Sequence, residues 1–394
     1  MLSEQQILTV KSTIPLLESV GPDITKHFYQ RMFRDNPELK NIFNMAHQQS
    51  GSQSLALFNA LAAYAKYIDN LPMLTGAVQR IAHKHSALNI RPEHYGIVGH
   101  HLIETLRELA SEAFTAEVED AWVAAYGQLA DVFITVEAGL YQANAEQVGG
   151  WQGPRKFKLI EKRIESELVK SLVFEPVDGQ PVVGYQAGQY IGIRVKPLTS
   201  EHFEMRQYSL STSPNAETYR ISVKREAMGV PGIVSNYLHD ALRLGEEVEL
   251  YPPAGDFVFH NNAKPVVTIS AGVGLTPMQA ILETLAECGY QAPVFYLHAC
   301  ENHQQHSFKK RLKQLAKQLN LTHHTWYNQE DTQEDNIHHG LMDLSTLDNL
   351  PLTEGDFYLC GPVGFMLFAK QQLVNLGVAI ERIHYEMFGP HQEI

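Results

Sequence analysis

The sequence predicts a multi-domain chain with three successive folds: an all-α part, an antiparallel β-barrel, and an α/β part built on a doubly wound parallel sheet. Apolar residues recur at helical spacing, without a convincing strand, from residue 1 to about residue 147. Short strands and turns follow, and from residue 264 strands alternate with helices. Because 394 residues exceed one ordinary core, we expect domains at 1–147, 155–263 and 264–394, with a linker at 148–154.

Composition and charge narrow the class of protein. Hydrophobic residues make up 44% and charged residues 19% of the chain, as in soluble globular proteins. The formal net charge of −13 disfavours nucleic acid and anionic membrane as partners. We expect no membrane-spanning segment and no signal peptide, since long apolar runs are lacking. Cys288, Cys300 and Cys360 are too few for a plant-type iron–sulfur cluster or a disulfide framework, which favours a reducing cytoplasm.

The first third of the chain predicts six to eight helices, as in a small all-α domain. Ile24, Phe28 and Met32 form one apolar stripe at helical spacing. Turn signals such as Gly21-Pro22 and Asn36-Pro37 separate the helices.

One of these helices carries a histidine with two interpretations. His85 shares a face with Val78 and Ile81, where a lone histidine is often a packed core residue, and the alternative is a metal ligand. A zinc pair made by His83 and His85 is disfavoured, because side chains two positions apart on a helix point in different directions.

Glycine and proline end the helical pattern at Gly149–Pro154, which we interpret as the linker. Strands begin with Lys156–Ile160 and continue, with turns, to about residue 262. Pro252–Phe257 closes this part of the chain.

A strand-like run within this part, Met205–Ser211, contains Arg206-Gln207-Tyr208-Ser209. This pattern suits a flavin dinucleotide: a planar guanidinium for the pyrophosphate, an aromatic ring against the isoalloxazine, and a hydroxyl near its redox-active nitrogen. The alternative is an ordinary edge strand.

Two further segments favour the flavin. Gly188-Gln189-Tyr190 delivers a second aromatic residue, and Gly232 precedes an apolar helical run whose first backbone N–H groups can hold phosphate. The sequence here resembles the ferredoxin–NADP reductase-like flavoproteins, whose flavin motif is Arg-x-Tyr-Ser. The resemblance implies a FAD-binding β-barrel with these contacts: Tyr190, Arg206, Gln207, Tyr208, Ser209, Gly232, Val234 and Ser235.

The last part begins with an apolar strand, Pro265–Ser270, which runs into Gly272-Val273-Gly274-Leu275-Thr276-Pro277. Ligands of open α/β sheets bind at such strand ends. Pro277 replaces the third glycine of the Rossmann fingerprint, so the motif alone is weak. We expect Thr276 to cap the next helix and Pro277 to occupy its first position.

A second strand-to-helix turn, Cys360-Gly361-Pro362, strengthens this interpretation. Together the two turns resemble the nicotinamide nucleotide motifs of the same reductase family. The C-terminal Met387-Phe388-Gly389-Pro390 resembles the segment that places an aromatic residue at the flavin, although an ordinary last strand remains the alternative. The sequence does not decide between NADH and NADPH.

The first third resembles a bacterial globin, and the whole chain resembles the flavohaemoglobins. The resemblance rests on these residues: Tyr29, Asn36-Pro37-Glu38-Leu39, Phe43-Asn44-Met45, Gln53, Leu57, Lys84-His85, Tyr95, Trp122, Tyr126 and Glu137. It implies a globin domain in which His85 is the proximal ligand of haem b and Phe43 packs on the haem.

The same resemblance assigns the residues around the haem. Tyr95 and Glu137 hydrogen-bond the proximal imidazole, which makes it a stronger donor to iron. On the distal side, Tyr29 donates to bound oxygen, beside Gln53 and Leu57, which share a helix face at i and i+4. Lys84 and Glu386 match positions that tune electron flow between flavin and haem.

The implied function is a nitric oxide dioxygenase, in which NAD(P)H reduces FAD, FAD reduces haem, and haem-bound O₂ converts NO to nitrate in NO detoxification. We expect a monomer whose partners are O₂, NO and NAD(P)H. Two alternatives stay open at this point: a haemoprotein that senses O₂ or NO, and a general NAD(P)H-dependent reductase.

Overall fold

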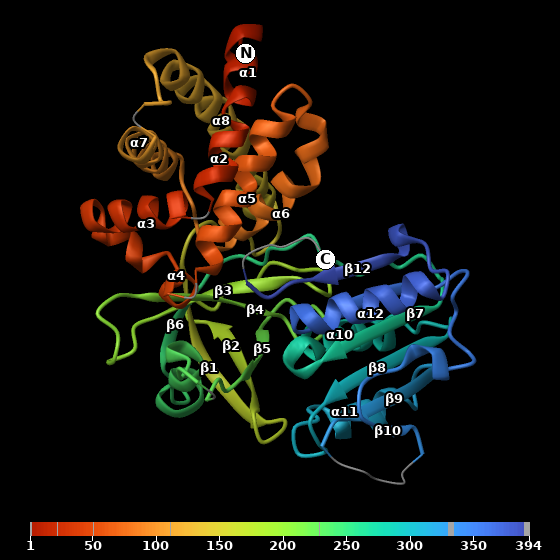
Figure 1. Cartoon of the computed structure of the whole chain (residues 1–394). Coiled ribbons are helices and arrows are strands. Elements are labelled where there is room, and N and C mark those ends of the chain that lie inside the picture. The colour runs from red at the N-terminus through yellow and green to blue at the C-terminus, as the bar shows by residue number, and fades with distance from the viewer. Residues whose placement is uncertain are drawn as a thin grey trace. The chain divides into compact units, whose positions relative to one another are not determined.

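The computed structural model describes residues 2–21, 23–49, 51–110, 112–227, 229–329 and 335–389 (Figure 1). Contacts divide the chain into two compact units. The first holds the described residues of Met1–Glu146, with the segment Ser200–Arg206 and Gly389. The second holds the parallel sheet and the antiparallel sheet, except for Glu204–Arg206 of the latter. Along the described chain no helix is long and apolar enough to cross a membrane.

The first unit is helical, as predicted. Its elements are α1 (Glu4–Ser12), α2 (Ile14–Val20), α3 (Asp23–Asp35), α4 (Met45–Gln49), α5 (Ser52–Tyr67), α6 (Thr75–Ala87), α7 (Pro92–Leu109) and α8 (Ala116–Glu146), with 3₁₀ turns at Pro37–Asn41 and Leu71–Leu74.

Local signals explain where several of these helices begin. Ser3 and Gln6 form a reciprocal capping box at the start of α1. Pro92 occupies the first turn of α7, where its missing N–H costs nothing. The apolar stripe predicted on α3 is buried, with Met32 fully enclosed.

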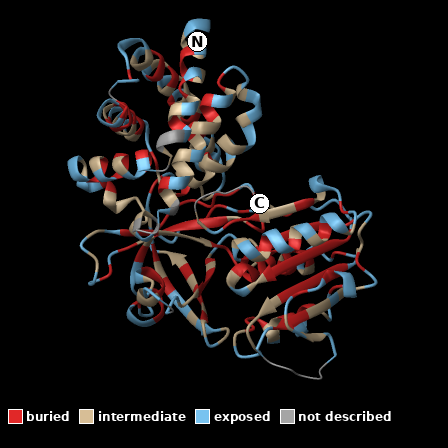
Figure 2. Cartoon of the chain, viewed as in Figure 1, coloured by how far each residue is buried: buried red, intermediate tan, exposed pale blue. Residues whose placement is uncertain are grey.

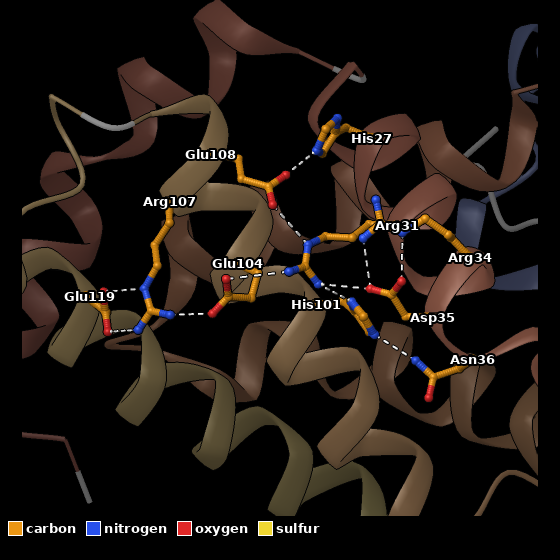
Figure 3. A network of polar contacts seen from close by, with 10 residues as sticks. All are labelled: His27, Arg31, Arg34, Asp35, Asn36, His101, Glu104, Arg107, Glu108 and Glu119. Atoms are coloured by element: carbon orange, nitrogen blue, oxygen red, sulfur yellow. Dashed lines mark hydrogen bonds and ion pairs between the residues drawn. The ribbon is translucent and has the colours of Figure 1, made fainter.

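A polar network fixes α3 against α7 (Figure 3). Arg31, two residues after Tyr29, lies 3.5 Å from a Glu104 carboxylate oxygen and 3.2 Å from one of Glu108. Its Nη1 also donates to Nδ1 of His101 at 2.8 Å. Burial and the neighbouring Arg31 charge lower the pKa of His101, which keeps that imidazole neutral and able to accept. The network therefore restrains the helix that carries Tyr29.

The first sheet is antiparallel and has the strand order β4-β3-β6-β1-β2-β5. Its strands are β1 (Arg155–Ile164), β2 (Val169–Pro176), β3 (Tyr190–Val195), β4 (Glu204–Ser209), β5 (Tyr219–Lys224) and β6 (Glu247–Leu250). The segment between β5 and β6 contains α9 (Ile233–Asn236) and a π-helical turn at Tyr237–Ala241. A bridge between Leu210, just after β4, and Ile221 of β5 links the two edge strands, as closure into a barrel requires.

The second sheet is parallel and has the order β10-β9-β8-β7-β11-β12. Its strands are β7 (Val266–Ala271), β8 (Val294–Cys300), β9 (Leu321–Tyr327), β10 (Ile337–His339), β11 (Asp356–Cys360) and β12 (Ile383–Glu386), and its helices are α10 (Leu275–Glu287), α11 (Lys309–Leu315) and α12 (Val363–Asn375). Its central strands are buried on both faces (Figure 2). The chain moves outward from β7 in one direction through β8 and in the other through β11, so the switch point that binds ligands lies between β7 and β11.

One local prediction about this domain is wrong. The segment Gly272–Gly274 forms a 3₁₀ turn that leads directly into α10, so the helix begins at Leu275 with Gly274 as its N-cap. Thr276 is therefore inside the helix, and its Oγ1 donates to the carbonyl of Val273 at 3.0 Å instead of capping. Pro277 is the third helical residue, not the first.

Candidate functional site

Three helices bring His85, Tyr95 and Glu137 together. The Nδ1 atom of His85 on α6 lies 2.7 Å from Oε1 of Glu137 on α8 and 3.0 Å from the hydroxyl of Tyr95 on α7. The Tyr95 hydroxyl donates to the same Glu137 oxygen at 2.5 Å. Glu137 is only 2% exposed, so the carboxylate is held inside the helical core by these two donors.

This arrangement fits a haem ligand. Because Nδ1 of His85 is engaged, Nε2 is the ring nitrogen left to bind a metal, and the carboxylate fixes that tautomer. Burial and the Glu137 charge raise the pKa of Tyr95 far above its ordinary value, so the phenol stays protonated and donates. The ring of Phe133 packs 5.7 Å from that of His85 and limits its rotation.

Tyr29 is the centre of a second polar group in the same unit. It lies on α3, where it is buried, and this burial raises its pKa to about 12. The nearby amide side chains of Gln53 on α5 and Gln48 on α4 partly oppose that rise in pKa. Phe43 packs edge-on against the Tyr29 ring at 5.8 Å. Leu57, one turn after Gln53, packs against the same apolar core.

A positive group on α6 was missed by sequence reasoning. The Nε atom of Arg80 is buried and has no hydrogen-bond partner in the described part of the chain. A haem carboxylate is a partner of the right charge for it. Lys84, one turn later, donates from Nζ to the carbonyl of Gly389 at 2.6 Å, within the same unit.

The proposed flavin residues lie on three segments of the barrel. On β4, Arg206 Nη1 donates to the carbonyl of Met205 at 2.7 Å and lies 3.1 Å from the Glu204 carboxylate. The hydroxyl of Ser209 is buried and finds no partner among the described residues. An unpaired buried hydroxyl is costly, so its placement fits a site that a flavin nitrogen completes. Gln207 and Tyr208 lie on the same strand, and Tyr208 packs against the barrel core.

Tyr190 begins β3 and is 6% exposed. Burial, then the charges of Glu386 and Asp256, raise its pKa well above the ordinary value. A Cβ at Gly255 would stand 2.9 Å from its ring, so glycine permits this close packing.

Gly232 is the N-cap of α9, and Val234 and Ser235 are buried in its single turn. The Ser235 hydroxyl accepts from the Glu226 backbone N–H at 3.2 Å. Its side chain therefore shapes the loop, and the backbone at the start of α9 is the group that can meet a phosphate.

The two nucleotide motifs meet at the switch point of the parallel sheet. A Cβ at Gly274 would stand 2.2 Å from the carbonyl oxygen of Cys360, so only glycine allows the turns after β7 and β11 to touch. Leu275, Thr276 and Pro277 are buried, whereas Gly272 and Pro362 are exposed and Val273 is partly exposed. The backbone of these turns is thus the surface offered to a nucleotide.

Glu386 ends β12, directly beside Cys360 in the register of the sheet, and is 7% exposed. Burial, then this carboxylate, raise the pKa of the Cys360 thiol, which is flanked by Gly361. Met387 is buried and Phe388 is half-exposed, while the predicted contact Pro390 lies outside the described residues.

Comparisons with known proteins match the helical part, the antiparallel sheet and the parallel sheet to three separate families. Three family models match: Globin at residues 26–133, Oxidoreductase FAD-binding domain at 156–259, and Oxidoreductase NAD-binding domain at 268–371. A protein of Vibrio cholerae serotype O1 named Flavohemoprotein is 56% identical over 396 residues, with 100% of both chains covered.

Two solved structures are similar as well. One is a flavohemoglobin from Malassezia yamatoensis with bound FAD and heme, which has 28% sequence identity and a TM-score of 0.88, covering 98% of this chain and 100% of that one. The other is the FAD/NAD-binding domain of nitric oxide dioxygenase from Vibrio cholerae O1, with 50% identity and a TM-score of 0.58, covering 60% of this chain and 99% of that one.

Proposed function

Because the chain belongs to the flavohaemoprotein family, and is therefore an NAD(P)H-dependent oxidoreductase with haem and FAD as cofactors, we propose that it is a nitric oxide dioxygenase. The reductase part of the Vibrio nitric oxide dioxygenase, half identical to this chain, supports the proposal. In the overall reaction, two NO and two O₂ take up the two electrons of one NAD(P)H, and two nitrates, one NAD(P)⁺ and one proton are released.

The observation that carries the proposal is the Glu137–His85 contact of 2.7 Å, reinforced by Tyr95. A buried carboxylate that accepts the Nδ1 proton gives the imidazole more negative character and makes Nε2 a stronger donor. Such a ligand favours oxygen activation over simple oxygen carriage. When bound, haem supplies the iron at which O₂ and NO meet, and FAD converts a hydride into single electrons.

In the second polar group, Tyr29 contributes one phenolic O–H among apolar side chains. We assign it as the donor to the reacting ligand. Phe43 and Leu57 exclude water around it, which strengthens any hydrogen bond made there.

In the reductase part, we assign Arg206 to the FAD pyrophosphate, Ser209 to the flavin nitrogen, and Tyr190 with Tyr208 to packing on the ring. The turns at Gly272–Gly274 and Cys360–Pro362 hold the nicotinamide nucleotide. Lys84 and Glu386 tune electron flow from flavin to haem. The domain limits at 147, 154 and 263 are part of the same proposal.

A turnover experiment tests this function. NO loss is followed by stopped flow under O₂ with NADH and, separately, NADPH, and nitrate is quantified. We expect sustained NO consumption with equal amounts of nitrate formed. A sensor would show one binding event without turnover. A general reductase would keep its main activity after removal of residues 1–147, whereas the dioxygenase would lose it entirely.

A further inference from the structure

A second amide, Gln48, lies beside Tyr29 and has no assigned role. It is carried by α4, which packs on α5, the helix of Gln53 and Leu57. Its side chain and that of Gln53 both lie near enough to the Tyr29 hydroxyl to lower the pKa of that phenol. Polar groups from three different helices therefore approach one another among otherwise apolar side chains.

The Nε2 atom of Gln48 differs from its neighbours because it is buried and makes no hydrogen bond to any described residue. A buried N–H without an acceptor costs free energy, so a folded protein usually pairs it or reserves it for a ligand. The phenol of Tyr29 has a single proton to donate, whereas the amide of Gln48 has two. Gln48 can therefore serve a ligand without removing the Tyr29 donor.

We propose that Gln48 is a specificity-determining residue of this pocket: its Nε2–H₂ group is a second donor to a small diatomic ligand that carries negative charge on its outer atom. Such a donor stabilises O₂ more than CO, because CO places less charge on that atom. The inference rests on the assignment of Tyr29 to the ligand side of the haem. The inference does not rest on NO chemistry. The test of Gln48 therefore stays valid whether or not the protein consumes NO.

The test uses the full-length holoprotein with Gln48→Leu, which keeps the side-chain volume and removes the amide. Loss of one hydrogen bond to the charged outer atom predicts O₂ dissociation faster by roughly 10- to 150-fold. CO dissociation should change by less than the O₂ rate, and the infrared CO stretch should lose its low-frequency component. Gln48→Asn should restore part of the O₂ effect if the shorter amide still reaches the ligand.

Gln142→Leu is the matched control, because Gln142 is an exposed glutamine of α8 whose amide donates to the Glu146 carboxylate at 2.7 Å. It should change neither rate. Haem content and the ferric spectrum of Gln48→Leu should match the parent. If O₂ and CO dissociation accelerate equally, the pocket has simply loosened and the proposal is wrong.

A Tyr29→Phe background separates direct donation from an effect through the tyrosine. A direct donor keeps an effect of about tenfold or more on O₂ release when Tyr29 is replaced. An effect of Gln48→Leu that vanishes in that background, or an unchanged O₂ rate and CO band in the single variant, overturns the proposal.

Discussion

The two polar groups of the helical unit, one around His85 and one around Tyr29, are built in opposite ways. Around His85, the Nδ1 atom, the Tyr95 hydroxyl and the Glu137 carboxylate satisfy one another at 2.5–3.0 Å. Around Tyr29, the Nε2 atom of Gln48 is left without a partner in the described chain. The first group suits a permanent bond to a cofactor, and the second suits a ligand that comes and goes.

The largest effect is expected from a substitution in the group around His85. His85→Ala removes the ring that offers Nε2 to iron, so stable haem binding should be lost while FAD stays bound and NAD(P)H–ferricyanide activity persists. Absorbance of haem and flavin in the purified variant measures both. His83→Ala is the matched control, because two positions along α6 point it elsewhere, and it should retain haem. Retained haem with lost FAD in His85→Ala would contradict the assignment.

The second largest effect is expected from a substitution in the group around Tyr29. Tyr29→Phe keeps the ring and removes a hydrogen bond to a charged ligand, so O₂ should dissociate roughly 10- to 150-fold faster. Flash photolysis or ligand replacement measures the rate. Flavin reduction by NAD(P)H should be unchanged.

Tyr64→Phe provides the control for that experiment. Tyr64 is another buried tyrosine of the helical unit, but its hydroxyl donates to the carbonyl of Ala125 at 2.8 Å. Its removal should affect stability and leave the O₂ rate alone. A Tyr29→Phe rate within about twofold of the parent would make Tyr29 a core residue only.

A smaller effect is expected from the residues that hydrogen-bond to His85. Glu137→Gln keeps an acceptor but removes the negative charge, so the imidazole donates less and the haem potential should rise. Loss of such an outer partner commonly lowers metal affinity or activity by about 10- to 100-fold. Tyr95→Phe should shift the potential less, because the Glu137–His85 bond remains. A potential equal to the parent's in Glu137→Gln would contradict the role of the carboxylate.

More of the fold than of the site could be predicted from the sequence. Periodicity shows helices, strands and their alternation because these patterns are local, and the predicted helical, antiparallel and parallel parts are all confirmed. The helix start at Leu275 was missed, because a 3₁₀ turn and the contact of Gly274 with Cys360 override the capping tendency of Thr276.

The site depended on long-range contacts that spacing does not reveal. His85 and Glu137 are 52 positions apart, and only packing of α6 against α8 brings them together. Gln48 and Arg80 carried no recognisable pattern, because a single amide on a five-residue helix and a single arginine look like surface residues. Their buried, unpaired nitrogens distinguish them only in three dimensions.

The most direct measurement of the central claim is the fate of oxygen in the product. The holoprotein turns over NO with NAD(P)H under O₂ labelled with ¹⁸O in both atoms, and nitrate is analysed by mass spectrometry. A dioxygenase transfers both atoms of one O₂ to each NO, so the nitrate should carry two labelled oxygens. Nitrate with one or no labelled oxygen, or nitrite or nitrous oxide as the main product, would contradict the proposed function.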